Sequence, residues 1–319
     1  MELPSKVEPK YPTAPWRTMP WDDALRWLRE NDEQANFYPG VDTKSLVKQH
    51  PHLGCVDVRE VQVETPTGSQ PGRIYRDENA KESGHALVWV HGGAFVRGNI
   101  DIPEAHWVSL ELASRGIPVF NVEYSKCLGN VHYPVPSDDV MAAWIHATEN
   151  AEEFFGVSAS DLMIGGGSAG SALSGSVTVR LRDNGKSLPA GVIWSYPVLH
   201  PDGRHPEDPH DPIRPYGVFA LEYAGSHDAT TKPHVLVGND DGVGFPPTFM
   251  VICEKDPLRP SGEAFAKKLQ AASVPVDLRM EVGADHGHLN EPADSAALKT
   301  IESIAEWIWS RPRVATAKE

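Results

Sequence analysis

The chain has 319 residues, which is enough to bury a large core in one elaborated α/β domain or in two ordinary domains. It carries 29 Lys and Arg against 44 Asp and Glu, and the formal net charge of −15 argues against a nucleic-acid partner, whose phosphates it would repel. The three cysteines, Cys55, Cys127 and Cys253, show no C-x-x-C spacing, so the sequence indicates neither a disulfide framework nor a zinc site.

The N-terminal region lacks the apolar run that a signal peptide requires. Met1 to Pro15 is rich in proline and charge, and no stretch of the chain approaches the ~18 apolar residues of a membrane span. We therefore expect a cytoplasmic protein. Apolar residues at helical spacing predict a first helix between Asp22 and Asn31.

The apolar residues of the next predicted element are mostly valines, and their spacing is no longer helical. From Cys55 to Glu64 the valines alternate with polar residues apart from one slipped position, which predicts a half-exposed strand with a bulge or bend near Arg59 and Glu60. Gly72 to Arg76 is the expected hairpin partner of this strand.

From Ala86 onward, short apolar runs alternate with helical patterns. We expect strands at Ala86–Val90, Pro118–Val122, Leu162–Ile164, Gly191–Tyr196, Pro247–Cys253 and Val276–Val282. Helices are expected at about Ala105–Ser114, Asp138–Phe155, Ser168–Asp183, Ser261–Ala272 and Ala293–Trp309. Continuous apolar strands separated by helices indicate an α/β fold with a mostly parallel sheet covered on both faces. The opening antiparallel pair makes this sheet mixed.

One segment interrupts the alternation. Leu199 to Gly244 is rich in Pro, His, Asp and Gly, and it predicts only a short helix at Tyr216–Tyr223. A connection of this length between two strands is usually functional and often a lid. His200, His205 and His210 do not share a helix face with each other, so we expect a solvated cap loop here and not a metal site.

The run Gly165-Gly166-Gly167-Ser168-Ala169-Gly170 allows two interpretations. As G-x-S-x-G, from Gly166 to Gly170, it is a nucleophile elbow, in which a serine stands at the tight turn between a strand and a helix. As G-x-G-x-x-G it is the turn that seats a dinucleotide pyrophosphate. That second site needs an acidic residue about twenty positions further on. The next strand ends Trp194-Ser195-Tyr196-Pro197 without one, which favours the elbow.

A second glycine-rich segment, His91-Gly92-Gly93-Ala94-Phe95, directly follows the strand that ends at Val90. Two glycines at the end of a strand let backbone N–H groups turn inward and donate to a developing oxyanion. The alternative is an ordinary glycine-rich turn. Because a G-x-S-x-G motif lies downstream, we predict an oxyanion hole formed by the N–H groups of Gly92, Gly93 and Ala169.

An acid and a base follow in the order that this chemistry requires. Asp256 and His286 each stand just after one of the last two predicted strands. Because the carboxyl ends of parallel strands converge, we expect Ser168, Asp256 and His286 to meet at one edge of the sheet. Two alternatives remain open, Glu254 as the acid and His288 as the base.

The four motifs together resemble the hormone-sensitive-lipase-like branch of the α/β-hydrolases, a carboxylesterase group. An HGG loop, a G-x-S-A-G elbow, a D-P-L acid turn and an H-G histidine turn occur in that order between residues 85 and 309. The resemblance implies an α/β-hydrolase core over residues 55–198 and 245–319. It also implies that residues 1–54 and 199–244 form a cap.

Several positions depart from the family pattern. The residue before the nucleophile is often acidic in the family and is Gly167 here, while Ser171 stands where glycine is common. The segment from Tyr124 to Leu128 keeps only the tyrosine of the family's tyrosine-arginine-leucine-alanine-proline stretch. His288 replaces a common aromatic residue.

The hypothesis from the sequence is acyl transfer to water. Ser168 attacks an ester carbonyl, His286 takes the serine proton and returns it to the leaving alcohol, and Asp256 orients the imidazole. This chemistry requires no metal and no organic cofactor, and the expected substrate is a small or medium acyl ester. A lactonase, an amidase or a deacetylase could use the same triad, and a non-catalytic receptor could keep the fold. The sequence does not indicate an oligomeric state.

Overall fold

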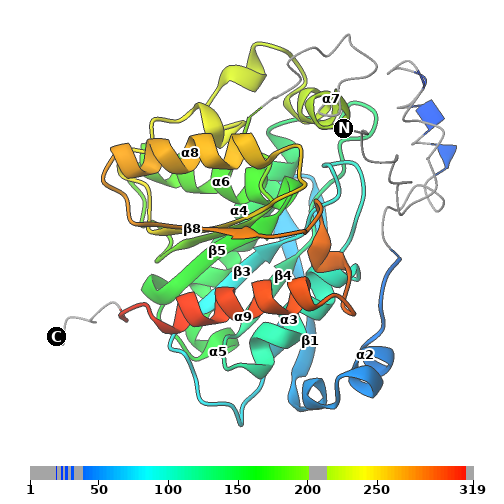
Figure 1. Cartoon of the computed structure of the whole chain (residues 1–319), viewed down its shortest axis with the longest axis vertical. Helices are drawn as coiled ribbons and strands as arrows, with labels where there is room; N and C mark the ends of the chain where they lie inside the picture. The colour runs from blue at the N-terminus through cyan, green and yellow to red at the C-terminus, as the bar shows by residue number, and fades with distance from the viewer. Residues whose placement is uncertain are drawn as a thin grey trace, which may run out of the picture.

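The protein is built around one mixed sheet (Figure 1). The computed structural model describes residues 39–200 and 214–313, together with six single residues between 19 and 31. Eight strands lie in the order β1-β2-β4-β3-β5-β6-β7-β8. β2 runs antiparallel to β1 and β4, and the other neighbouring pairs are parallel. The predicted mostly parallel, mixed sheet is therefore confirmed.

The observed elements match the predicted β/α alternation. The strands β1 to β8 span Asp57–Thr65, Gly68–Arg76, Ala86–Val90, Val119–Val122, Leu162–Gly167, Val192–Ser195, Thr248–Cys253 and Val276–Glu281. The helices α2 to α9 span Thr43–Gln49, Pro103–Ser114, Val135–Glu149, Ala151–Phe155, Ala169–Asp183, Arg214–Ala224, Arg259–Ala271 and Ser295–Trp309. The helix predicted at Asp138–Phe155 is two helices, α4 and α5, which are interrupted at Asn150. The helix predicted between Asp22 and Asn31 lies largely outside the described residues.

The bulge predicted in β1 is wrong. β1 and β2 pair without interruption from Asp57 opposite Arg76 to Thr65 opposite Gly68. The slipped valine has another cause, since this edge strand packs on both faces of the sheet. Its first half, represented by Val58, contacts one hydrophobic cluster, and its second half, represented by Val63, belongs to the other.

Two hydrophobic clusters, one on each face of the sheet, fix the helices in place. Side chains of α4 to α8 form the larger cluster, and side chains of α2, α3 and α9 form the other. Successive residues of the central strands alternate between them: Val88 lies in the first cluster and Trp89 in the second. The carboxyl ends of the parallel strands thus emerge together between two helical layers, and this edge carries the candidate site.

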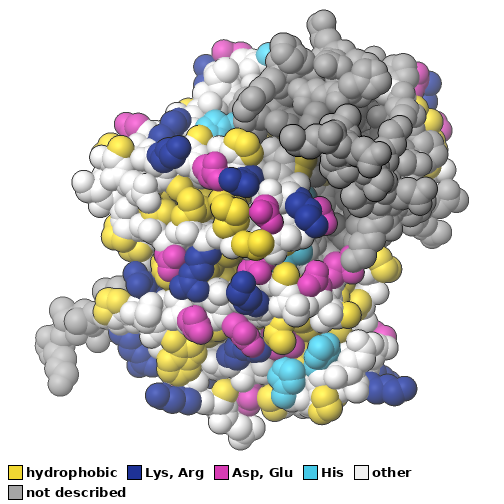
Figure 2. Space-filling view, in the orientation of Figure 1, with side chains coloured by type: hydrophobic (Ala, Val, Ile, Leu, Met, Phe, Trp, Pro, Cys, Tyr) yellow, Lys and Arg dark blue, Asp and Glu magenta, His cyan; other side chains and the backbone are white. Residues whose placement is uncertain are grey.

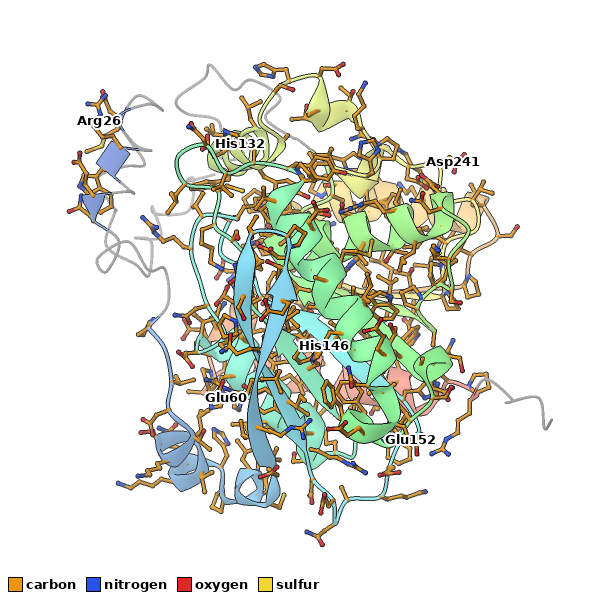
Figure 3. The ribbon with its side chains drawn as sticks, turned by 180° about the vertical axis from the view of Figure 1, so that it is seen from behind. Arg26, Glu60, His132, His146, Glu152 and Asp241 are labelled. Carbon is orange, nitrogen blue, oxygen red and sulfur yellow. The ribbon has the colours of Figure 1, made fainter. Side chains whose placement is uncertain are left out.

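The outer surface mixes charged and apolar side chains. On the face over α8, β8 and α9, basic, acidic and hydrophobic groups lie interspersed (Figure 2). On the opposite side, Glu60 lies on the edge strand β1, while His146 and Glu152 lie on α4 and α5 (Figure 3). In the described part of the chain, we find no helix that combines the length and the apolar character needed to cross a bilayer.

Candidate active site

Ser168 stands at the turn between β5 and α6, in a backbone conformation that L-residues rarely adopt. Its φ is 49° and its ψ is −117°. A Cβ atom at Gly166 would lie 2.3 Å from the carbonyl oxygen of Val90, and one at Gly170 would lie 1.9 Å from the same oxygen. Strand and helix therefore approach each other so closely that only glycine fits at both positions. This is the packing that a nucleophile elbow requires.

The three side chains that the sequence places at the sheet edge form a hydrogen-bonded chain. Ser168 Oγ lies 2.8 Å from Nε2 of His286. Nδ1 of the same imidazole lies 2.8 Å from Oδ2 of Asp256. Asp256 is buried, with 5% of its surface exposed, and Ser168 is 8% exposed, so both lie in a protected site. The arrangement has the geometry of a nucleophile, a base and an orienting acid.

The two alternative residues are engaged elsewhere. Nε2 of His288 hydrogen-bonds to Thr300 Oγ1 at 2.8 Å, and its Nδ1 lies 3.3 Å from the sulfur of Cys253. Glu254 accepts the backbone N–H of Gly283 at 2.8 Å. The geometry therefore favours His286 over His288 and Asp256 over Glu254.

The pKa shifts of the two histidines support the same choice of base. Burial lowers the pKa of His286, but the charge of Asp256, the hydrogen bond to it and the charge of Glu104 more than offset this, so that the pKa is raised. Burial lowers the pKa of His288 to about 4, partly offset by Asp294, while the nearby imidazole of His286 lowers it further. The base candidate is thus held where it can gain a proton, and its neighbour is held neutral.

The loop after β3 turns sharply at the glycines. Gly93 has a φ of 124°, and a Cβ atom there would lie 1.9 Å from the carbonyl oxygen of Arg97, so the position requires glycine. The next two residues, Ala94 and Phe95, also have positive φ values of 54° and 66°. Such strain in non-glycine residues is typical of functional loops.

One of the three predicted oxyanion donors is not available in this structure. The N–H of Gly92 donates to Oε1 of Glu104 at 2.5 Å, so it points away from an oxyanion at Ser168. The prediction of Gly92 as a donor is therefore wrong for this conformation. The N–H groups of Gly93 and Ala169 have no hydrogen-bond acceptor among the described residues.

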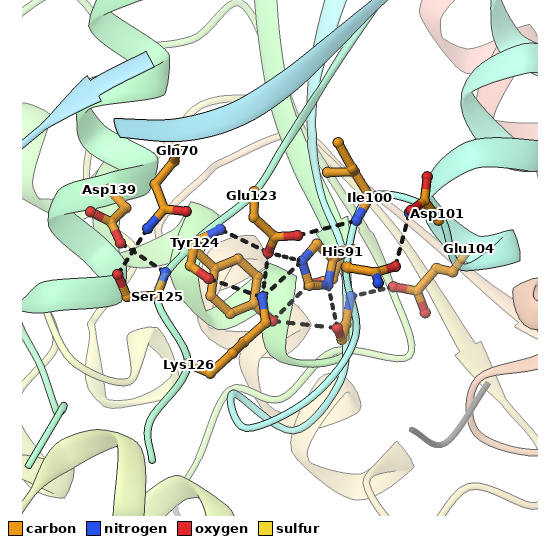
Figure 4. Close-up of polar contacts among 12 residues, drawn as sticks. Gln70, His91, Ile100, Asp101, Glu104, Glu123, Tyr124, Ser125, Lys126 and Asp139 are labelled. Atoms are coloured by element: carbon orange, nitrogen blue, oxygen red, sulfur yellow. Dashed lines mark hydrogen bonds and ion pairs between the residues drawn. The ribbon is translucent and has the colours of Figure 1, made fainter. Parts of the chain in front are cut away.

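A partly buried ionic cluster supports this loop (Figure 4). Nε2 of His91 lies 2.8 Å from Oε1 of Glu123, which also forms a short contact with the ammonium of Lys126. The second carboxylate oxygen of Glu123 accepts the N–H of Ile100 at 3.3 Å. Burial raises the pKa of this carboxyl, but the charges of Lys126 and His91 lower it overall. The lysine, which departs from the family pattern, thus joins the support of the loop.

Sequence reasoning did not single out Glu104 or Tyr196 as site residues. Both are buried, and the Tyr196 hydroxyl donates to Oε2 of Glu104 at 2.6 Å. The ring of Tyr196 lies 5.1 Å from that of His286. The sequence did not mark Glu104 as a site residue because α3 is buried on nearly every side. Its sequence therefore has no polar face and no apolar face that would identify an acid pointing inward.

The hydrogen-bonded chain of Ser168, His286 and Asp256 has the geometry to make the serine a nucleophile. The described residues contain no group of three or more His, Cys, Asp or Glu side chains that could hold a metal. The histidine-rich part of the predicted cap, residues 201–213, lies outside the described residues.

The sheet order, the helical layers and the elbow define an α/β hydrolase. A comparison with known families agrees, because residues 87–290 match the model described as the alpha/beta hydrolase fold. The chain therefore belongs to this family, in its hormone-sensitive-lipase-like branch.

Curated relatives include several proteins that are named for ester hydrolysis. Carboxylesterase NlhH of Mycobacterium tuberculosis is 33% identical over 236 residues, which cover 69% of this chain and 71% of NlhH. Carboxylic ester hydrolase LipN of the same organism is 29% identical, and the match covers 74% of this chain but 65% of LipN. Ethyl acetate hydrolase of Pseudomonas putida is 27% identical, covering 74% of this chain and 78% of that protein.

Solved structures show the same fold. The thermophilic carboxylesterase EstE1, cloned from a metagenomic library, superposes with a TM-score of 0.72 at 24% identity, covering 91% of this chain and 98% of EstE1. The esterase of Pyrobaculum calidifontis gives a TM-score of 0.72 at 22% identity, covering 90% of this chain and 97% of that one. At these identities the likeness supports the fold alone.

Proposed function

We propose that the protein is a serine carboxylesterase that hydrolyses small or medium acyl esters. The observation that carries this proposal is the hydrogen-bonded chain from Ser168 through His286 to Asp256 at a nucleophile elbow. The three curated relatives described above are named as esterases or ester hydrolases, which supports the choice of ester bonds.

The proposed reaction has two similar halves. Ser168 Oγ attacks the ester carbonyl carbon while its proton passes to Nε2 of His286, and the carbonyl electron pair becomes an oxyanion. The oxyanion collapses, the C–O bond to the alcohol breaks, and His286 returns the proton to the leaving alcohol. Water then attacks the acyl-enzyme with His286 as base, which releases the acid and restores the serine. Asp256 keeps Nδ1 protonated and stabilises the charged imidazole.

The oxyanion hole that we propose differs from the expected one by one residue. It keeps the N–H groups of Gly93 and Ala169, and Ala94, the next residue of the strained loop, replaces Gly92 as the third donor. Losing one such donor typically costs about 3 kcal/mol of transition-state stabilisation. The reaction draws on no metal or organic cofactor.

We propose that residues 199–244 form a cap over this core, together with the part of residues 1–54 that precedes α2. Leu46 of α2 and Leu53 belong to the second hydrophobic cluster. The ring of Tyr223, at the end of α7, stacks on Phe95 of the oxyanion loop with 4.4 Å between centroids. Tyr133 packs edge-on against the same tyrosine at 6.1 Å. These contacts link the insertion to the catalytic loop, so the cap is placed to influence acyl-chain preference.

The test is hydrolysis of p-nitrophenyl esters of increasing acyl length, with a lactone and an anilide in the same panel. We expect turnover of short and medium esters, loss of essentially all turnover in Ser168→Ala, and full activity in Ser160→Ala, whose exposed serine lies in a surface turn. A fluorophosphonate should label the wild type and not Ser168→Ala. Turnover confined to the lactone or the anilide would identify the rival hydrolases. No turnover and no labelling of the wild type would favour a receptor.

A further inference from the structure

Glu104, in the first turn of α3, links three segments of the candidate site. Its side chain is buried beside the loop of His91 (Figure 4), and 2% of the residue is exposed. Oε1 accepts the N–H of Gly92 at 2.5 Å, while Oε2 accepts the Tyr196 hydroxyl at 2.6 Å and Nδ2 of Asn290 at 3.3 Å. These donors belong to the oxyanion loop, the segment after β6 and the turn beyond the catalytic histidine.

The same carboxyl group lies directly against the elbow. A Cβ atom at Gly167, the residue before the nucleophile, would lie 2.5 Å from Cδ of Glu104 and 2.6 and 2.8 Å from its two oxygens. Atoms do not approach that closely, so any side chain at position 167 would displace Glu104. The departure from the family pattern at Gly167 is therefore matched to the carboxyl group that occupies this space.

Glu104 is linked to His286 through Tyr196, which donates to Glu104 and whose ring lies 5.1 Å from the imidazole, and the charge of Glu104 raises the pKa of His286. Of the groups that hydrogen-bond to this carboxylate in the described part of the chain, none is basic, so its field is not cancelled locally. Inside a protein such a field is weakly screened. Within the described residues, the imidazole is also approached by Asp256 after β7, Ser168 at the elbow, the Tyr196 ring at 5.1 Å and His288 on the following turn.

We propose that Glu104 is a positioning residue of this site. Its shape holds the oxyanion loop, the elbow and the histidine turn in register, and its charge favours the protonated imidazole that forms when Ser168 attacks. This inference rests on the proposed function. In this inference a single carboxylate, through its contacts with Gly92, Tyr196 and Asn290, supports the oxyanion loop, the elbow and the histidine turn.

Glu104→Gln keeps the shape of the side chain and removes the charge. The amide can still accept the N–H of Gly92, but its NH₂ group cannot accept from Tyr196 and Asn290. Since a misplacement of about 1 Å can cost 100-fold in rate, we expect a partial effect, a fall of about tenfold in kcat with KM little changed. The acid limb of the kcat/KM profile should shift to lower pH, because the protonated imidazole loses a stabilising charge.

Two further variants separate charge from geometry. Glu104→Asp keeps the charge but shortens the side chain, so kcat should fall while the acid limb stays close to that of the wild type. Glu111→Gln is the matched control, because Glu111 is a buried acid on the same helix whose carboxylate contacts His52, Arg115 and Trp107 instead of the site. We expect it to change stability and to leave kcat and the pH profile as they are.

The readouts are steady-state kinetics on p-nitrophenyl acetate from pH 4 to 9, thermal unfolding, and an NMR pH titration of the His286 ring. Wild-type kcat and an unmoved acid limb in Glu104→Gln would overturn the inference and leave the proposed function standing. Equal loss of stability in Glu104→Gln and Glu111→Gln without loss of kcat would also overturn it, as a purely structural role. If the wild type hydrolyses no ester, the proposed function fails. An unchanged His286 titration in Glu104→Gln would separately refute the inference.

Discussion

Replacing His286 and His288 one at a time separates the proposed base from its neighbour. The two imidazoles are close in the chain, but they have different partners. Nε2 of His286 lies 2.8 Å from Ser168 Oγ, whereas Nε2 of His288 lies 2.8 Å from Thr300 Oγ1 and its other nitrogen faces Cys253. His286→Ala should therefore lower kcat, whereas His288→Gln should lower the stability of the fold.

The two substitutions should also differ greatly in their effects on kcat and on the free energy of unfolding. Loss of the base from a serine-hydrolase triad lowers kcat by about 10⁶-fold in a measured case, and we expect at least about 10⁴-fold here. His288→Gln disturbs two polar contacts at about 1 kcal/mol each, so the free energy of unfolding should fall by about 2 kcal/mol. For a chain of 319 residues that corresponds to a Tm lower by about 3 °C.

Stopped-flow measurement of the p-nitrophenolate burst tests the chemical half of this prediction, and urea unfolding tests the structural half. We expect His286→Ala to remain folded without a burst, and His288→Gln to keep the burst with a lower urea midpoint. A burst that survives in His286→Ala, or disappears in folded His288→Gln, would refute the assignment of the base.

Three further predictions concern pH, packing and charge. Asp256→Asn should lower kcat by about 10⁴-fold. It should also move the acid limb of kcat/KM to lower pH, because the raised pKa of His286 depends on that charge against the opposing effect of burial; an unmoved limb in the pH–rate profile would contradict this. Gly170→Ala puts a Cβ 1.9 Å from the last carbonyl of β3 and should cost about 3 kcal/mol in urea unfolding, unless strand and helix separate freely, in which case stability is unchanged. Asp240→Asn breaks a bidentate pair with Arg182, at 2.7 Å for each bond, and should cost about 2 kcal/mol at pH 7, less than a fully buried pair because the arginine is partly exposed. Burial raises the pKa of Asp240, but its hydrogen bonds to Arg182 lower it overall, so this stability is present above the unfolded pKa of about 3.9 and is lost as the pH falls through the folded value. Unfolding at pH 7 and pH 3 measures the difference, and a constant difference would refute the linkage.

The sequence was sufficient to place Ser168, Asp256 and His286 at one edge of a sheet, because the order of strands and motifs determines where the chain must emerge. Motif position favoured His286 over His288 but left His288 open as an alternative base. That distinction depends on which imidazole faces the elbow and which faces Thr300 on α9, and neither contact leaves a local pattern.

The error in predicting Gly92 as an oxyanion donor has a similar cause. A glycine-rich loop indicates that backbone N–H groups are presented, but it does not say which of them an internal acceptor takes. That acceptor, Glu104, lies on a helix whose residues are almost all buried, so no periodic pattern separates its inward face from an outward one. The broken helix at Asn150 and the continuous pairing of β1 also depend on packing with distant elements.

At each glycine of the elbow, a neighbouring group of the protein leaves no room for a side chain. A Cβ atom at Gly165 would lie 2.1 Å from a carbonyl oxygen of β6, and Cβ atoms at Gly166 and Gly170 would lie 2.3 and 1.9 Å from the last carbonyl of β3. At Gly167 the space is taken by the carboxyl group of Glu104. In a dinucleotide turn, glycines of this spacing leave room for the backbone to approach a pyrophosphate. Here the room is filled by strands and by an acid whose charge would repel phosphate, so the glycine pattern is explained by the packing of an elbow.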